Sequence, residues 1–129
     1  MRTERKKLKK QETYMIETAE TGIESSVVNV IDWHHERNLI EGSDDKQQVL
    51  KLVQEVGELS DSICKNACPI DDIGDIIVIL VNIAERNQLS LKQCIDHAYE
   101  DIKDRKGVMV DGIFIKEADG YDPDTYGNR

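Results

Sequence analysis

Aromatic side chains are scarce in this chain, which has 129 residues. They make up 5% of it, with a single Trp and a single Phe. A hydrophobic core must therefore be built from Ile, Leu, Val and Ala, a composition that suits helices packed against one another. The length corresponds to one domain that is large enough for a real core but too short for two.

Cysteine is also infrequent, and its pattern argues against two structural roles. Cys64, Cys68 and Cys94 are odd in number, and none forms a ligand pair with one of the three histidines. This pattern argues against structural zinc and against a disulfide framework. Because the chain also shows no signal peptide and no long apolar span, we expect a cytoplasmic protein with reduced thiols and no membrane contact.

Basic residues are outnumbered, since 17 Lys and Arg face 26 Asp and Glu for a net charge of -9. This balance argues against binding to nucleic acid or to a membrane surface, but a bound divalent cation would still allow a phosphate substrate. The first ten residues are positively charged instead, with six basic residues and one acidic residue. We expect residues 1–24 to form a basic and polar arm, for which RNA binding is the less favoured interpretation.

Apolar residues recur at helical spacing in four segments. A first helix begins near Ser25 or Ser26, and Ser43 can cap a second, with Asp44 and Asp45 in its first turn. The predicted helices span residues 25–38, 43–66, 71–86 and 91–106. The third begins at Asp71 or Asp72 and is apolar on every side, so it is expected to be the most buried, and a homodimer or homotetramer is expected to cover it.

The pattern changes after the fourth helix. Two short apolar runs flank Asp111 and Gly112, a pair typical of a type I′ turn, which predicts a hairpin over residues 108–115. Residues 118–129 are acidic and rich in turn formers, and they are expected to be a flexible tail. The fold class is therefore all-α: a helical domain over residues 25–117, four-helix bundle-like, with a short C-terminal β-hairpin.

Two pairs of carboxylates stand out on the second and third helices. Glu55 and Glu58 are three residues apart, as are Asp72 and Asp75, so each pair lies on one face of its helix. If these helices pack antiparallel, four carboxylates face one another and repel unless cations lie between them. The sequence therefore predicts a site for Mg²⁺, with Mn²⁺ also possible.

Several other residues can each be interpreted in two ways. The second helix has the apolar stripe Leu52, Val56, Leu59 and Ile63, and Glu55 borders it. Trp33 either packs in the core or flanks a nucleobase, and Asn82 either reaches the site or is satisfied inside the core. Lys103 and Arg105, near the end of the fourth helix, either favour that helix terminus or bind phosphate.

Several segments, in this order, resemble the MazG-like all-α nucleoside triphosphate pyrophosphohydrolases, in particular the small single-domain members common in phages. The resemblance covers residues 27–119. It includes WHHERNLI, KLVQEVGEL, DDIGDIIVILVNIAE, AYEDIKDRKG and MVDGIFIKEAD. The chain departs from the family pattern at three positions: Gln54 and Asp72 stand where the family has Glu, and Asp101 where some members have Lys.

The resemblance implies a hydrolase that cleaves the α–β phosphate bond of an NTP or dNTP and releases a nucleoside monophosphate and pyrophosphate. It further implies that Glu55, Glu58, Asp72 and Asp75 bind Mg²⁺ and that Lys51 and Arg105 hold the triphosphate. Glu58 or Glu55 would orient or deprotonate the attacking water. Of the alternatives, a di-iron protein is disfavoured because no Glu has a His three residues later. A non-catalytic helical interaction protein with a vestigial carboxylate cluster is the other.

Overall fold

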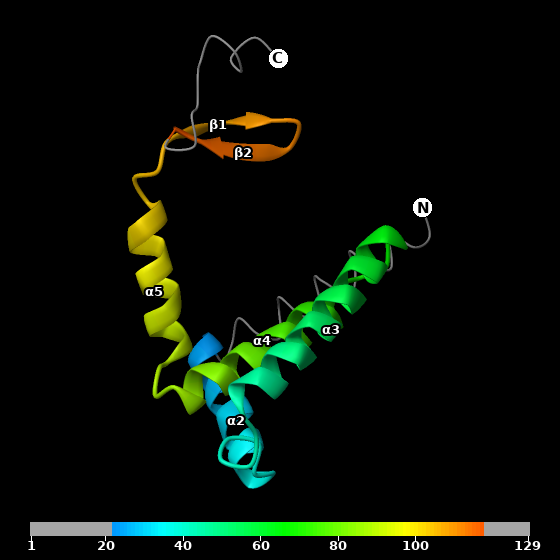
Figure 1. The fold of residues 1–129 in the computed structure, drawn as a ribbon, viewed down its shortest axis with the longest axis vertical. Helices are drawn as coiled ribbons and strands as arrows, with labels where there is room; N and C mark the ends of the chain where they lie inside the picture. The colour runs from blue at the N-terminus through cyan, green and yellow to red at the C-terminus, as the bar shows by residue number, and fades with distance from the viewer. Residues whose placement is uncertain (1–21, 118–129) are drawn as a thin grey trace. The chain divides into compact units, whose positions relative to one another are not determined.

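The computed structural model describes residues 22–117, which form four helices and one hairpin (Figure 1). The chain divides into two compact units, residues 1–91 and 92–129, and each is described separately. The prediction of a mostly helical chain with a C-terminal hairpin is confirmed. The expected basic arm and acidic tail lie outside the described residues, except for residues 22–24, which are helical.

Helix α2 spans Gly22–Glu36 and therefore begins three residues before the predicted start at Ser25. The Ser25 hydroxyl donates to the carbonyl of Gly22, at 3.2 Å, so this side chain bonds back within the helix. Asn38, just beyond the end of the helix, has a φ of 56°. Such a left-handed residue ends a helix, and Asn adopts this conformation more readily than most side chains.

Helix α3 spans Asp45–Cys64, and its N-cap is Asp44 instead of the predicted Ser43. The Asp44 carboxylate accepts from the backbone N–H of Gln47 at 2.8 Å. An Asp cap satisfies a free amide and also places negative charge at the positive end of the helix dipole, which a Ser hydroxyl does not do. Ser43 accepts instead from the side-chain amide of Gln48 at 2.9 Å.

Helix α4 spans Ile70–Arg86 and is the centre of the first unit, because both α3 and α2 pack against it. It runs antiparallel beside α3 (Figure 1). Its buried residues are Ile79, Val81, Asn82 and Ala84. It is therefore the helix that contributes most to the core, as predicted.

Burial of α4 on all sides, however, is not observed. Ile73, Ile77 and Leu80 are exposed, and on α3 the predicted apolar stripe is also partly exposed at Val56 and Ile63. Glu55, beside this stripe on α3, is buried instead, with 8% of its surface accessible. The face of α3 that meets α4 is thus rotated toward Glu55, away from the stripe that hydrophobicity alone selects.

The second unit contains helix α5, Leu91–Ile102, except for its first residue, and strands β1, Gly107–Val110, and β2, Ile113–Lys116. The strands pair antiparallel with Val110 opposite Ile113. Asp111 and Gly112 connect them with φ values of 51° and 80°, as the predicted type I′ turn requires. Helix α5 ends four residues before the predicted Lys106, so Lys103 and Arg105 follow the helix and do not form its last turn.

Among the described residues, no helix combines the length and the apolar character needed to cross a bilayer.

Candidate metal centre

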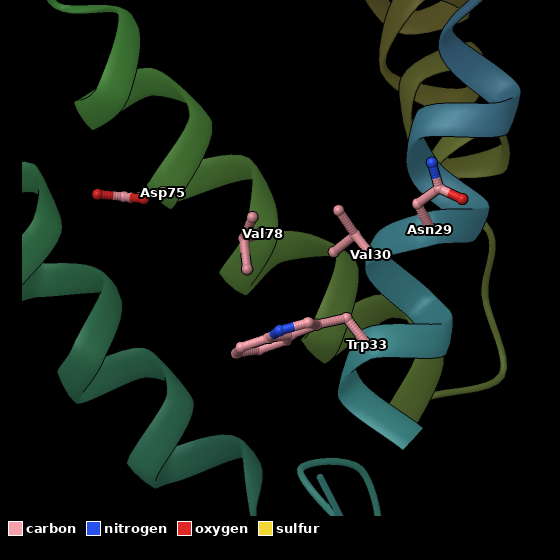
Figure 2. A pocket seen from close by; sticks show the side chains of 5 residues that line it. All are labelled: Asn29, Val30, Trp33, Asp75 and Val78. Carbon is pink, nitrogen blue, oxygen red and sulfur yellow. The ribbon is translucent and has the colours of Figure 1, made fainter. Parts of the chain in front are cut away.

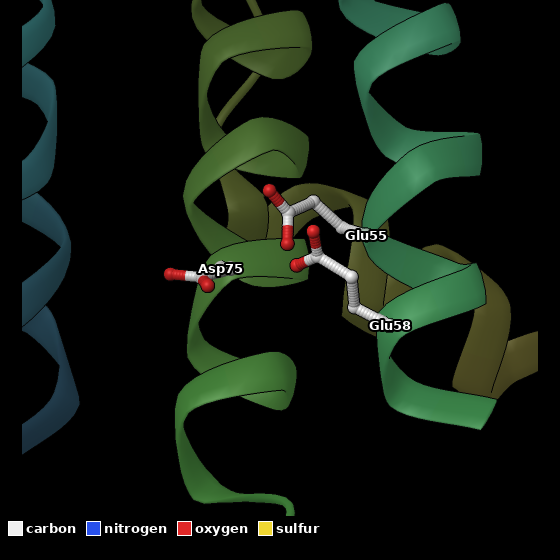
Figure 3. A group of neighbouring side chains, drawn as sticks. All are labelled: Glu55, Glu58 and Asp75. Atoms are coloured by element: carbon white, nitrogen blue, oxygen red, sulfur yellow. The ribbon is translucent and has the colours of Figure 1, made fainter. Parts of the chain in front are cut away.

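Three carboxylates from two helices converge in the first unit. Glu55 and Glu58 extend from α3 and Asp75 extends from α4 (Figure 3). One oxygen of each lies within 4.8 Å of an oxygen of the other two. The spacing of three residues brings the two glutamates to one face of α3, and antiparallel packing brings Asp75 opposite them.

Glu55 is the buried member of this cluster, and its environment disfavours the charged form. Its Oε2 atom has no hydrogen-bond partner among the described residues. The pKa of Glu55 is raised above its ordinary value of 4.5, first by the close Glu58 carboxyl, with which it can share a proton, and then by burial and the charge of Asp75. Lys51, whose Nζ lies 3.9 Å from Glu55 Oε1, opposes this shift.

This donor set fits a hard divalent cation. Carboxylate oxygens are the preferred ligands of Mg²⁺ and Mn²⁺, and an unpaired buried oxygen is a costly arrangement that a cation would relieve. Glu55, Glu58 and Asp75 are the residues that could hold the ion, while exposed Glu58 and Asp75 leave the cluster open on one side.

Asp72, the fourth predicted ligand, is not a member of the group within 4.8 Å. It is half-buried on α4, one helical turn before Asp75. The short Asp side chain, at a level about 4.5 Å along the helix axis from Asp75, explains why its oxygens do not join the others. The structure therefore brings together three of the four predicted carboxylates.

A pocket of about 400 Å³ lies beside this cluster. Its lining residues are Asn29, Val30 and Trp33 from α2 and Asp75 and Val78 from α4. Val30 and Val78 face each other, and the indole of Trp33 extends away from α2 along one side of the pocket (Figure 2). Because Asp75 belongs to both the pocket wall and the carboxylate cluster, a molecule in the pocket would lie next to a cation bound there.

The indole of Trp33 is held by its neighbours on α2. The Arg37 guanidinium lies 4.6 Å from the centre of the ring, and its Nη1 donates to the carbonyl of Trp33 at 3.3 Å. The His34 ring meets the indole edge-on, with 5.2 Å between the ring centres. A cation over one indole face and an imidazole at its edge fix the orientation of the ring.

The remaining predicted substrate residues lie in three different places. Lys51 is at the edge of the cluster, as its distance to Glu55 shows. Asn82 is fully buried, and its Nδ2 contacts His34 and Leu39 while its Oδ1 has no hydrogen-bond partner among the described residues, so contact of Asn82 with a substrate stays a prediction. Lys103 pairs with Glu100 at 2.6 Å in the second unit, and phosphate binding by Lys103 and Arg105 stays a prediction.

His34 is the residue whose importance the sequence did not single out. It is buried, and its ring nitrogens approach the Val78 carbonyl at 2.9 Å and the side-chain amide of Asn82 at 3.3 Å. The available signal was its position at helical spacing from Val27, Val30 and Ile31. A polar residue on an apolar stripe needs a buried partner, and Asn82 on the most apolar helix was the matching residue.

Comparison with known proteins adds one relative. No family model matches the chain, and no solved structure matches it. The chain is similar to a Haemophilus phage HP1 (strain HP1c1) protein described as "Uncharacterized 18.2 kDa protein in rep-hol intergenic region", with 35% identity over 69 residues. The match covers 52% of this chain and 42% of the phage protein, so the chain spans less than half of that relative.

Proposed function

We propose that the protein is a Mg²⁺-dependent nucleoside triphosphate pyrophosphohydrolase. Hydrolysis of the α–β anhydride would consume one water and release a nucleoside monophosphate and pyrophosphate. The observation that carries the proposal is that Asp75 lies both in a carboxylate cluster and in the wall of a pocket that contains Trp33. A cation site for phosphates and an apolar, aromatic pocket for a base would then be adjacent, as a nucleotide requires.

The residues of the cluster divide the chemistry among them. Glu55, Glu58 and Asp75 would hold the cation, which supplies neutralisation of the phosphate charge and a water of lowered pKa when bound. Glu58 or Glu55 would accept the proton of the attacking water, because both carboxylates converge on the same point. Lys51, beside Glu55, would contact a phosphate oxygen. Trp33 would stack on or flank the base.

Self-association is the second part of the proposal, because much of the apolar surface of the first unit is uncovered. Advancing about 100° per residue places four exposed residues of α3 within a sector of about 80° and three of α4 within about 60°. These residues, called the α3–α4 apolar face below, are Val49, Val53, Val56, Ile63, Ile73, Ile77 and Leu80. On each helix the centre of this sector lies more than about 100° from the carboxylates of the metal centre, so the two sectors share the side of the helix pair opposite that centre.

A second copy of the chain is the occupant that best fits this face. Residues 1–21 contain only two large aliphatic side chains, Leu8 and Ile16, and residues 118–129 contain none, so neither segment can cover seven aliphatic positions. A second α3–α4 pair offers the same uncharged aliphatic surface, and a twofold axis would bring the two pairs together as four helices. The metal centres would face outward, one on each copy.

The competing function is a non-catalytic helical interaction protein. The exposed apolar residues are compatible with it, because an interaction protein also needs an uncovered surface. The buried carboxylate of Glu55 favours the enzyme, since its Oε2 oxygen has no hydrogen-bond partner among the described residues, a cost that interaction alone does not require.

Turnover of a nucleotide panel separates the two functions. The full chain with Mg²⁺ should release pyrophosphate from at least one NTP or dNTP, and Glu58→Gln should reduce the rate at least about a hundredfold, the scale of a lost general base. The matched control is Asp61→Asn, an exposed acid on the same helix that pairs with Lys65 at 2.7 Å. No turnover of any nucleotide, together with no binding of Mg²⁺, would leave the interaction protein as the better description.

A further inference from the structure

The strongest feature outside the proposed chemistry is a buried polar contact between α2 and α4. His34 has 3% of its surface exposed and Asn82 has 0%. His34 Nε2 lies 2.9 Å from the carbonyl oxygen of Val78, and His34 Nδ1 lies 3.3 Å from Asn82 Nδ2. Asn82 Nδ2 also donates to the carbonyl of Leu39 at 3.0 Å.

These contacts assign the proton on the imidazole. The Val78 carbonyl can only accept, so Nε2 of His34 carries the hydrogen. Nδ1 then has a free lone pair and accepts from the amide of Asn82, whose second hydrogen goes to Leu39. The neutral ring and the amide therefore fix each other, and they join α2, α4 and the loop after α2 at one point.

This contact lies directly behind the pocket. His34 follows Trp33 on α2, and the carbonyl that accepts from His34 belongs to Val78, which itself lines the pocket with Asp75, one turn earlier on α4. The hydrogen bond thus sets the separation between the α2 wall and the α4 wall. An apolar residue at position 34 would fill the same volume without fixing this separation or satisfying Asn82.

We propose that His34 is a positioning residue for the pocket: with Asn82 it holds Trp33 at the distance from Asp75 that a heteroaromatic base needs while its phosphates contact the cation. This role rests on the proposed function, because the base and the phosphates are those of the nucleotide. Among the contacts above, His34 meets the edge of the Trp33 indole in the pocket wall and touches no residue of the carboxylate cluster. Its loss should affect binding of the base and leave the chemical step in place.

Three variants test the role of His34. His34→Ala removes both contacts, whereas His34→Gln keeps an amide that can donate to Val78 in place of Nε2. His35→Ala is the matched control, because His35 is the adjacent histidine but is exposed and contacts Glu85 at 3.2 Å. Steady-state kinetics of the full chain with Mg²⁺ and its preferred nucleotide should show KM raised about tenfold in His34→Ala, because Trp33 is no longer held against the base, with kcat nearly unchanged. His34→Gln should recover most of the loss, and His35→Ala should match the wild type.

A second readout does not depend on turnover. Trp33 is the only tryptophan in the chain, so its fluorescence reports on the pocket wall alone. Acrylamide should quench Trp33 more strongly in His34→Ala than in the wild type, His35→Ala or His34→Gln, while Mg²⁺ still raises the Tm of all four proteins equally. Circular dichroism checks that each variant is folded, and His34→Gln carries the comparison if His34→Ala is not.

Two results would overturn the positioning role. Equal quenching in wild type and His34→Ala would show that Trp33 is held without His34. A fall in kcat at unchanged KM would place the effect at the chemical step. If the wild type hydrolyses no nucleotide, the proposed function fails, and the quenching experiment alone still decides whether His34 positions Trp33.

Discussion

Arg86, the last residue of α4, donates from Nε to the carboxylate of Asp45, the first residue of α3, at 3.0 Å. Asn87 donates to the other oxygen of the same carboxylate at 3.1 Å. Ten residues along α3 from Asp45 is Glu55, and eleven residues back along α4 from Arg86 is Asp75. The contact at the ends of the two antiparallel helices therefore sets the register in which the two ligands face each other.

Loss of this contact should weaken both the fold and the metal centre. Asp45→Ala removes two hydrogen bonds to a half-exposed carboxylate, which should lower the free energy of unfolding modestly because solvent screens the contact. It should also weaken Mg²⁺ binding, because the register of Glu55 and Asp75 is less restricted. Urea unfolding and calorimetric Mg²⁺ titration measure the two effects. Asp61→Asn, which removes an exposed pair, is the control and should change neither.

The same carboxylate gives the contact a pH dependence. Hydrogen bonds from Asn87 and then Arg86 lower the pKa of Asp45 below its ordinary value of 3.8. Its folded pKa is lower than its unfolded pKa, so its contribution to stability is present above the unfolded value and is lost as pH falls through the folded value. The difference in stability between the wild type and Asp45→Ala should therefore shrink in acid. A constant difference down to strongly acidic pH would show that charge is not involved.

Three carboxylates, and not four, should dominate cation binding. Mg²⁺ in excess of its Kd should raise the Tm of the wild type by several degrees, since it binds only the folded chain. Asp75→Asn should abolish most of this shift, whereas Asp72→Asn should retain most of it because Asp72 lies outside the group within 4.8 Å. Equal losses in the two variants, measured by differential scanning fluorimetry, would mean that Asp72 is a ligand after all.

The raised pKa of Glu55 predicts how the stability of the fold responds to pH when no divalent cation is present. Its pKa is raised by Glu58, by burial and by Asp75, so the folded chain binds this proton more tightly than the unfolded chain. The resulting stability is present below the ordinary value of 4.5 and is lost as pH rises through the raised folded pKa. In EDTA the Tm should therefore fall as pH rises toward neutrality.

Glu55→Gln and Mg²⁺ supply the controls for this pH effect. Glu55→Gln removes the titrating group and should make the Tm at neutral pH higher than that of the wild type in EDTA. Mg²⁺ should raise the Tm of the wild type again at neutral pH but have little effect on the Tm of Glu55→Gln, which lacks the buried ligand. A wild-type Tm that is independent of pH in EDTA would contradict the assigned environment of Glu55.

The sequence predicted helices and hairpin well because each depends on local signals. A type I′ turn requires positive φ values at both central residues, which Asp111 and Gly112 have. An Asp-Gly pair between two short apolar runs is therefore a local signal for a hairpin. The Glu55–Glu58 spacing likewise puts both carboxylates on one helical face in any packing. Asp75 was predicted to lie near Glu55 and Glu58 because a short connection between two helices favours antiparallel packing.

The parts that the sequence did not predict depend on the orientation of one helix relative to another. Hydrophobicity selected Val56 and Ile63 for the core, but the rotation of α3 is set by contacts such as Asp45 with Arg86, which no periodic pattern encodes. Asn82 and His34 form a second example, because each has two acceptable interpretations until the other is placed beside it. Pairwise polar contacts of this kind therefore need the three-dimensional arrangement.

The α3–α4 apolar face predicts a change in molecular mass on substitution. Val53 is 64% exposed at this face, and Leu50 is equally exposed, at 65%, but lies about 100° around α3 from its centre. Light scattering of the full chain should give a dimer or a larger assembly for the wild type. Val53→Glu should give a monomer, because two charges would be buried at the interface, and Leu50→Glu should keep the wild-type mass.

The Val53→Glu and Leu50→Glu variants also distinguish which part of the molecule covers the α3–α4 apolar face. Helix α5 carries its own exposed apolar residues, Ile95, Tyr99 and Ile102, and is the alternative occupant within the same chain. If α5 covers the face, the wild type is monomeric and Val53→Glu lowers its Tm without changing its mass. If a second copy covers it, mass and Tm fall together for Val53→Glu and the wild-type Tm rises with protein concentration, since dissociation is then linked to unfolding.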